Sequence, residues 1–140
     1  MPSAPQPPAP SAIERMVAQF GRRRLGALAP ETVAKAKLCV LDVLAGACAL
    51  PGDPRTVAAD AVANEATAGA PAIGGRRSLA PADAAFLNAV ASATAETNDT
   101  HAPTATHPGI VVVPAVLARA AARRLSGAAA LEGLVAGSAT

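Results

Sequence analysis

Residues 30–50 read Pro30-Glu-Thr-Val-Ala-Lys-Ala-Lys-Leu-Cys-Val-Leu-Asp-Val-Leu-Ala-Gly-Ala-Cys-Ala-Leu50, and this stretch decides the fold that the sequence predicts. Pro30 suits the first turn of a helix, and Glu31 suits the positive end of the helix dipole. Apolar side chains follow at helical spacing until the turn-forming residues Pro-Gly-Asp-Pro at 51–54. The stretch therefore predicts one long core helix. Its apolar side chains are Val33, Val40, Leu41, Leu44 and Ala47.

The segments on either side also show helical patterns. Ser11 can cap a first helix that is expected to end between Arg24 and Gly26. Its apolar face would hold Ile13, Met16, Val17 and Phe20. Further helices are predicted at about 55–67, 81–95, 108–124 and 127–137, and Phe86, Leu87 and Val90 are expected to point inward. Pro114 would kink its helix or mark the first turn.

Residues 69–77 are expected to form a loop, with at most a short extended piece at Ala72-Ile73. Taken together, the patterns predict an all-α fold, a helical bundle of about five or six helices. Residues 11–140 would form this helical domain, and residues 1–10 would be a disordered leader rich in Pro and Ala.

The composition argues against several classes of function. The chain has 140 residues, a net charge of +2, no Trp or Tyr and two Phe. Nucleic-acid bases would have little to stack on, so no nucleic-acid partner is expected, and the arginine pairs and triplet suit solvated helix ends. The longest apolar run, 38–50, is too short for a bilayer span, and residues 1–11 lack a signal-peptide pattern. A cytoplasmic protein without a membrane segment is predicted.

The two cysteines, Cys39 and Cys48, lie in the same predicted helix. Their separation along the helix axis, more than about 10 Å, is too large for an intrachain disulfide. Both are expected to be buried, reduced thiols that act as small apolar residues.

Most of the polar chemistry lies in residues 96–109, Glu96-Thr-Asn-Asp-Thr-His-Ala-Pro-Thr-Ala-Thr-His-Pro-Gly109, within a chain that is 51% hydrophobic and 16% charged. The stretch holds both histidines, and imidazole is the side chain best suited to proton transfer near neutral pH. Pro108-Gly109 allows a sharp turn that would bring the next helix N-terminus, which favours an anion, near His107. The loop therefore predicts a site for an anionic substrate whose C–H bond is deprotonated.

Two other interpretations of this loop stay open. Asp99 and Thr100 can form an Asx turn or a helix cap without any chemical role. A metal site made by Asp99, His101 and His107 is conceivable, but the spacing matches no standard zinc pattern and the chain has one such cluster only. No metal is therefore predicted.

Three blocks of the sequence resemble the N-terminal part of the MmgE/PrpD family, which includes 2-methylcitrate dehydratases, cis-aconitate decarboxylases and iminodisuccinate epimerases. Residues 28–42 are similar to the family pattern L-P-x-x-V-x-x-x-A-K-x-x-x-L-D, and residues 78–90 to A-x-x-A-A-x-x-N-x. The third block, Asn98-Asp-Thr-His101 followed by residues 107–115, is close to D-F-D-D-T-H … H-P-[GS]-x-x-[VI]-x-P-A. The blocks occur in the family's order, and the resemblance runs from about Ile13 to the end.

The resemblance implies cofactor-independent proton abstraction next to a carboxylate. The reaction expected is dehydration of a 2-methylcitrate-like hydroxy-tricarboxylate, as in propanoate catabolism, with decarboxylation or epimerisation of a related acid as the alternatives. His107 is the implied acid/base residue, and Thr100 and Asp99 would orient the substrate or the ring. The implied substrate-binding residues are Glu96, Asn98, His101 and Thr106.

The sequence departs from the family pattern in two ways. Glu96 stands where the family has its first Asp, and Asn98 replaces the middle carboxylate. The loss of a carboxylate at position 98 is expected to change the electrostatic field around the loop or the substrate preferred. Family members also continue through further helices and an α+β lid domain, which supply another histidine and carboxylate-binding lysines. The domain is therefore expected to be C-terminally incomplete. It would act as a homodimer or with a complementary chain, or else be a non-catalytic helical module.

Overall fold

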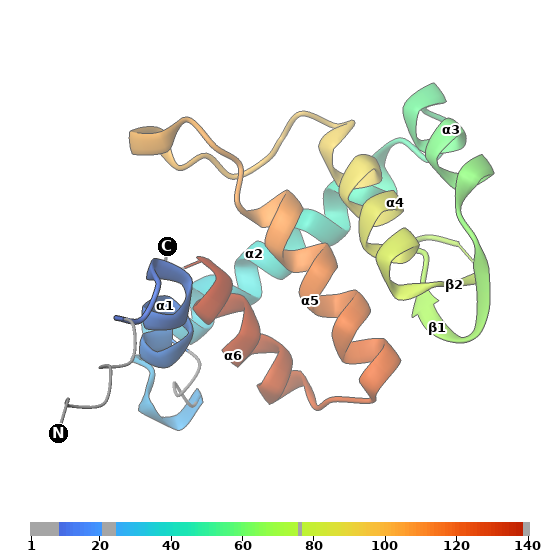
Figure 1. Cartoon of the computed structure of the whole chain (residues 1–140). Helices are drawn as coiled ribbons and strands as arrows, with labels where there is room; N and C mark the ends of the chain where they lie inside the picture. Colours follow the sequence, from blue (N-terminus) through green and yellow to red (C-terminus); the bar gives the residue numbers. More distant parts are fainter. Residues whose placement is uncertain (1–8, 21–24, 76, 139–140) are drawn as a thin grey trace, which may run out of the picture.

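The structure, a computed structural model, describes residues 9–20, 25–75 and 77–138. Six α-helices dominate this part of the chain (Figure 1). They are α1 (Ala12–Phe20), α2 (Pro30–Ala49), α3 (Pro54–Val62), α4 (Pro81–Ala93), α5 (Gly109–Arg123) and α6 (Gly127–Ser138), with short 3₁₀ turns η1 (Leu25–Ala27) and η2 (Ala102–Thr104). The predicted all-α architecture is confirmed, with one small sheet added. The prediction for residues 1–8 and the predicted end of the first helix at Arg24 lie outside the described residues.

The core is built from small side chains on α2, α4, α5 and α6. One cluster gathers Ala84 and Leu87 of α4 with Ala118 of α5 and the sheet residues, and a second joins Val43 of α2 to Val113 of α5. Gly46 lies where α2 crosses α4, and a Cβ atom there would meet the carbonyl oxygen of Ser92 at 2.8 Å. The close crossing therefore depends on the missing side chain.

The sheet corrects the prediction for residues 55–77. Helix α3 ends at Val62, and residues beyond it form strand β1 (Glu65–Pro71), which pairs antiparallel with β2 (Ser78–Leu79). Arg77 holds this turn, because its guanidinium donates to the carbonyl oxygens of Asp60 (3.0 Å) and Ala63 (3.1 Å) at the end of α3. A cation at a helix C-terminus is favourable, but this one comes from a distant loop. The local sequence of α3 therefore could not predict this stabilising contact.

The predicted burial of Phe86 and of Cys48 is also wrong. Helix α4 buries Ala84, Leu87, Asn88 and Ala91, which are spaced i, i+3, i+4 and i+7, so Phe86 points outward and is 55% exposed. On α2, Leu41 is 60% exposed and Cys48 is exposed, although Cys39 is half-buried and both thiols are free. The helix faces were set by which neighbours α2 and α4 meet. Pro114 lies inside α5, where it is buried.

Asn88 and Ser92 are buried polar residues of α4, and Asn88 makes contacts outside the helix. Its amide nitrogen donates to the carbonyl oxygen of Pro71 at 3.1 Å, and its Oδ1 accepts from the backbone N–H of Ile73 at 2.8 Å. Both polar atoms of the side chain are thus paired, as a buried amide requires. Asn88 therefore anchors the segment after β1 on the helical core.

Asp83 makes a similar connection at the start of α4, and it gives a pH-dependent contribution to stability. Its Oδ2 accepts from the backbone N–H and the side-chain amide of Asn64, at 2.9 Å and 2.8 Å, and these bonds hold the pKa of the Asp83 carboxyl below its ordinary value. A lowered folded-state pKa stabilises the fold above the unfolded-state pKa of about 3.9, and the contribution is lost as the pH falls through the folded-state value.

We therefore expect the Asp83→Asn variant to be less stable than the wild type at pH 7 and equally stable near pH 2. Urea unfolding followed by circular dichroism across this range measures the difference. A difference that is the same at both pH values would show that the charge of Asp83 contributes nothing.

Among the described helices, none is both long enough and apolar enough to cross a bilayer.

Candidate functional site

The loop that carries the candidate residues leaves the end of α4, projects from the helices and returns to the start of α5 (the orange excursion in Figure 1). Its first part is anchored: Thr94 is buried, and its hydroxyl donates to the carbonyl oxygen of Ala91 at 2.7 Å. Its middle part, residues 100–107, is exposed. The loop is thus fixed at both ends by packed helices, which position the polar side chains between them.

Asp99 binds the N-terminus of α5. Its two carboxylate oxygens accept from the backbone N–H of Gly109 at 3.0 Å and 3.1 Å. The helix N-terminus that was expected to hold a substrate anion therefore holds the protein's own carboxylate. A Cβ atom on Gly109 would lie 2.6 Å from Oδ1 of Asp99, so this glycine is needed for the close approach and not for a positive φ. Asp99 is a helix-capping residue in this structure.

His107 is held by the same turn. Its Nδ1 lies 2.7 Å from the carbonyl oxygen of Asp99 and 3.4 Å from the hydroxyl of Thr100. A carbonyl oxygen only accepts, so Nδ1 must carry the proton when the ring is neutral. Nε2 then carries a lone pair, and no described residue hydrogen-bonds it. The structure thus brings Asp99, Thr100 and His107 together and orients the imidazole as a base.

The other two loop candidates form a separate group at the tip. The Nδ1 atom of His101 lies 2.7 Å from the Thr104 hydroxyl, which lies 2.9 Å from the Thr106 hydroxyl. The backbone N–H of His101 also donates to the carbonyl oxygen of Thr106 at 2.9 Å, and Ala105 between them has a φ of 50°. These contacts shape the tip, and His101 and Thr106 are exposed.

Glu96 faces a different partner. It has a φ of 53°, its side chain is 81% exposed, and its Oε1 lies 3.9 Å from the guanidinium of Arg55. Arg55, which the sequence did not indicate, also donates to the carbonyl oxygen of Thr94 at 3.1 Å and so ties α3 to the base of the loop. At this exposure the ion pair with Glu96 contributes little.

A groove of about 520 Å³ lies between α2 and residues 97–99 of the loop. Lys35, Asp42, Thr97 and Asn98 supply polar groups, and the exposed Leu38 and Leu41 and the half-buried Cys39 are among its apolar neighbours. Among the described residues that line the groove, Lys35 is the one cation. Asp99 also belongs to the lining, and its carbonyl oxygen accepts a hydrogen bond from His107. Sequence reasoning missed Lys35, although the spacing of residues 35, 38 and 42 puts them on one helix face.

The described residues include no group of three or more His, Cys, Asp and Glu side chains arranged to hold a metal ion.

Comparison with known proteins gives one match. A family model described as the MmgE/PrpD N-terminal domain matches residues 15–139, which include the whole loop and α2. No curated protein and no solved structure matches the chain.

Proposed function

The chain belongs to the MmgE/PrpD family, and from this premise we propose that it takes part in the cofactor-independent dehydration of a 2-methylcitrate-like hydroxy-tricarboxylate in the cytoplasm. The observation that supports the proposal most is the orientation of His107. Its Nδ1 donates to a backbone carbonyl at 2.7 Å, which leaves Nε2 as a proton acceptor in the exposed part of the loop. Imidazole in this state is a general base near neutral pH.

In the proposed reaction, Nε2 of His107 takes the proton from the carbon next to a substrate carboxylate. The electron pair of the broken C–H bond forms a C=C bond with the neighbouring carbon, whose C–O bond breaks. The hydroxide that leaves takes up a proton from solvent, and the His107 ring returns its proton to solvent, so that the products are water and an unsaturated acid. The Thr100 hydroxyl, 3.4 Å from Nδ1, orients the ring.

The groove beside the loop supports binding of the carboxylates. Lys35 provides one positive charge in a lining that also holds the Asp42 carboxylate, and Thr97 and Asn98 provide hydrogen-bonding side chains from the loop. Asp99 contributes through position, since its carboxylate is occupied by the N-terminus of α5. Glu96, His101 and Thr106 remain candidates for contacts with the substrate.

The exposure of the loop supports a site that is completed by further chain, by a second copy or by a complementary chain. His107, Thr100 and His101 are all exposed, whereas proton abstraction from carbon is efficient in a site from which water is excluded. Exposed apolar side chains beside the groove, Leu38 at 59% and Leu41 at 60%, offer a surface for such a partner.

A non-catalytic helical module is the second candidate, and the capping role of Asp99 favours it. The Asp99 carboxylate caps the N-terminus of α5, and this structural role accounts for its presence even in a protein without catalytic activity.

One experiment separates these reactions. The protein is incubated in D₂O with 2-methylcitrate, cis-aconitate and iminodisuccinate, and each mixture is followed by NMR. Dehydration yields an alkene signal, decarboxylation removes a carbon, and epimerisation replaces the substrate C–H by C–D. We expect the alkene from 2-methylcitrate. If none of the three acids is converted by the protein together with the chain that completes it, the proposed reaction is wrong and the non-catalytic module is the remaining interpretation.

A further inference from the structure

The outer face of α2 carries a stripe of exposed apolar side chains along its length. On its inner face, Ala36 and Val43 are buried against Val113 of α5 and Leu134 of α6, and α2 passes behind α5 in Figure 1. The stripe lies on the other side of the helix. It consists of Ala34, Leu38, Leu41, Ala45 and Cys48, which are all exposed. The described part of the chain thus covers one face of α2 and leaves an apolar face open.

The spacing of this stripe is that of a coiled-coil seam. Its members lie four, three, four and three residues apart, which is the alternation of the apolar heptad positions a and d. Leu38 takes an a position, and Leu41 takes a d position. Ala36 and Val43 then fall at f, directly opposite the seam, as their burial in the core requires. A helix that is apolar on both faces is suited to burial on both, so the seam indicates a second helix packed along α2.

The charges beside the seam favour α2 of a second copy as that helix. Lys37 takes a g position and Asp42 an e position. Both are exposed, and neither has an ion-pair partner among the described residues. In a parallel pair, a g residue lies beside the e residue five positions further along the other helix, so two copies would pair Lys37 with Asp42 twice. An antiparallel pair centred on Leu41 would instead place the two Asp42 carboxylates side by side.

We propose that α2 packs in parallel against α2 of a second copy of this chain, through the seam Ala34, Leu38, Leu41, Ala45 and Cys48. Leu38 and Leu41 supply most of the apolar surface of the contact, because they are its largest side chains and are 59% and 60% exposed. The seam spans about two heptads, so the dimer is weak, with a Kd of about 10 μM.

The same contact bears on the groove between α2 and residues 97–99, because Leu38, Leu41 and Asp42 also belong to its lining. A second copy on this face would cover the groove. It would also place its own Lys37 beside Asp42 and so add a positive charge to the lining. The pairing rests on the proposed function for this role alone, since the seam and its charges are features of α2 itself.

Analytical ultracentrifugation of the chain without substrate tests the association. We expect a dimer whose affinity falls at least about tenfold in Leu41→Lys, because two ammonium groups would meet at the seam. Leu125→Lys is the matched control, since Leu125 is an exposed leucine that follows α5, and it should dimerise like the wild type. Circular dichroism should show that both variants are folded.

A chain that is monomeric at about 500 μM, or a dimer that Leu41→Lys leaves unchanged, would overturn the pairing. The proposed dehydration is judged separately, by NMR with 2-methylcitrate, so the failure of either leaves the other to its own test.

Charge reversal tests the alignment of the two helices. Lys37→Glu and Asp42→Lys each bring like charges together and should weaken the dimer about threefold or more. The double variant restores opposite charges and should dimerise like the wild type. Residues 37 and 42 do not face each other within one helix, so this recovery can come only from the second copy. Losses that persist in the double variant would overturn the parallel alignment.

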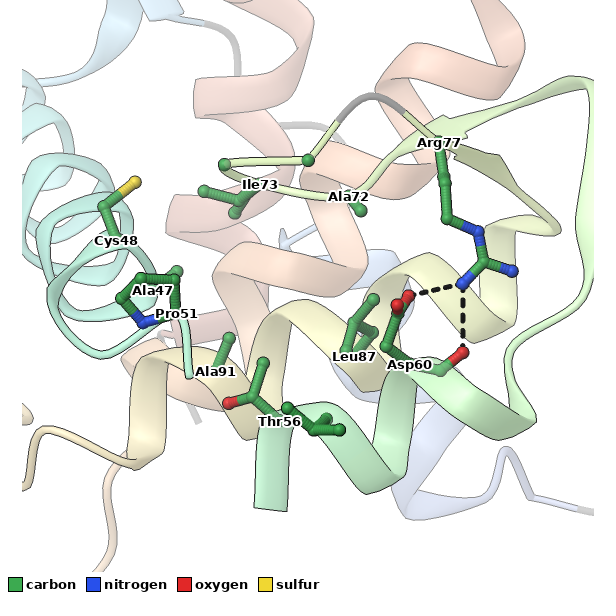
Figure 2. Close-up of a pocket in the computed structure, with 13 residues that line it drawn as sticks. Ala47, Cys48, Pro51, Thr56, Asp60, Ala72, Ile73, Arg77, Leu87 and Ala91 are labelled. Carbon is green, nitrogen blue, oxygen red and sulfur yellow. Dashed lines mark hydrogen bonds and ion pairs between the residues drawn. The ribbon is translucent and has the colours of Figure 1, made fainter. Parts of the chain in front are cut away.

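Cys48 reports the direction of the helices. Figure 2 shows it in the last turn of α2, at the edge of a pocket that Leu87 and Ala91 also line, and its thiol is exposed. In a parallel pair the two Cys48 side chains face each other. Diamide, which takes up the two electrons and two protons that the thiols lose, should therefore link the Cys39→Ser variant into a disulfide dimer.

The Cys48→Ser variant is the control for this linkage, because it keeps Cys39, which is half-buried and takes a b position outside the seam. It should stay unlinked. Linkage through Cys39, or none through Cys48 at concentrations where the chain is dimeric, would overturn the parallel seam.

Discussion

Replacement of His107 by Ala is expected to lower the rate of 2-methylcitrate dehydration by about 100- to 10,000-fold, the usual contribution of a general base. The reason is that Nε2 of this ring is the proton acceptor that the loop presents, while Nδ1 is engaged with the carbonyl oxygen of Asp99. The rate is measured as alkene formation, followed by NMR, in the protein together with the chain that completes the site.

His101 provides the matched control, because it is the other histidine of the chain and stands in the same exposed loop. His101→Ala should change the rate by less than about tenfold, since its ring binds the Thr104 hydroxyl at the tip. Free imidazole should restore part of the activity of His107→Ala, because it can occupy the space that the removed ring leaves. Full activity of His107→Ala would remove this residue from the mechanism. A rate loss without imidazole rescue, matched by an equal loss in His101→Ala, would indicate damage to the loop.

Substitution of Gly46 by Ala should lower the stability of the fold by about 1–3 kcal/mol, the usual cost of overpacking in a core. The added Cβ atom would lie 2.8 Å from the carbonyl oxygen of Ser92, which is backbone, so α2 and α4 must move apart. Ser92 is two residues from Thr94, where the loop is anchored, so the same movement should shift the imidazole signals of His107.

Gly133→Ala is the control, since Gly133 also lies inside a helix but a Cβ atom there would meet Val116 at an ordinary 3.7 Å. Alanine is favoured over glycine in a helix by about 1 kcal/mol, so this variant should be more stable than the wild type. Urea unfolding measures the change in the free energy of unfolding for both variants, which should be a decrease for Gly46→Ala and an increase for Gly133→Ala. Stabilisation by Gly46→Ala would show that the helices do not approach each other closely at this point.

Several features could be predicted from the sequence because their causes are local. Helix α2 begins at Pro30 and ends before Pro51, and α4 begins at Pro81, because proline suits a first turn and cannot continue a helix. The polar residues 96–109 stand between two helical patterns, so their place in a loop also followed from the sequence. The three family blocks could be identified from the sequence because each is a continuous stretch of residues, and the match over residues 15–139 confirms the family.

Other features were decided only by tertiary contacts. Strand β1 has no strong local preference and exists through its pairing with residues 78–79 and the bonds of Arg77 to the end of α3. Phe86 is exposed because α4 meets its neighbours through Leu87 and the residues in register with it. Periodicity in the sequence defines the faces of a helix, but which face is buried depends on which helix it meets.

The candidate site shows the same division. The sequence by itself determined that His107, Thr100 and Asp99 share one loop, because they are neighbours in the chain. Only the tertiary structure decided that Asp99 caps α5, that His107 presents Nε2, and that Lys35 lines the adjoining groove. The groove depends on how α2 lies against the loop, and the two hydrogen bonds depend on the backbone course of residues 99–109. Neither is defined by the periodicity or the spacing of the sequence.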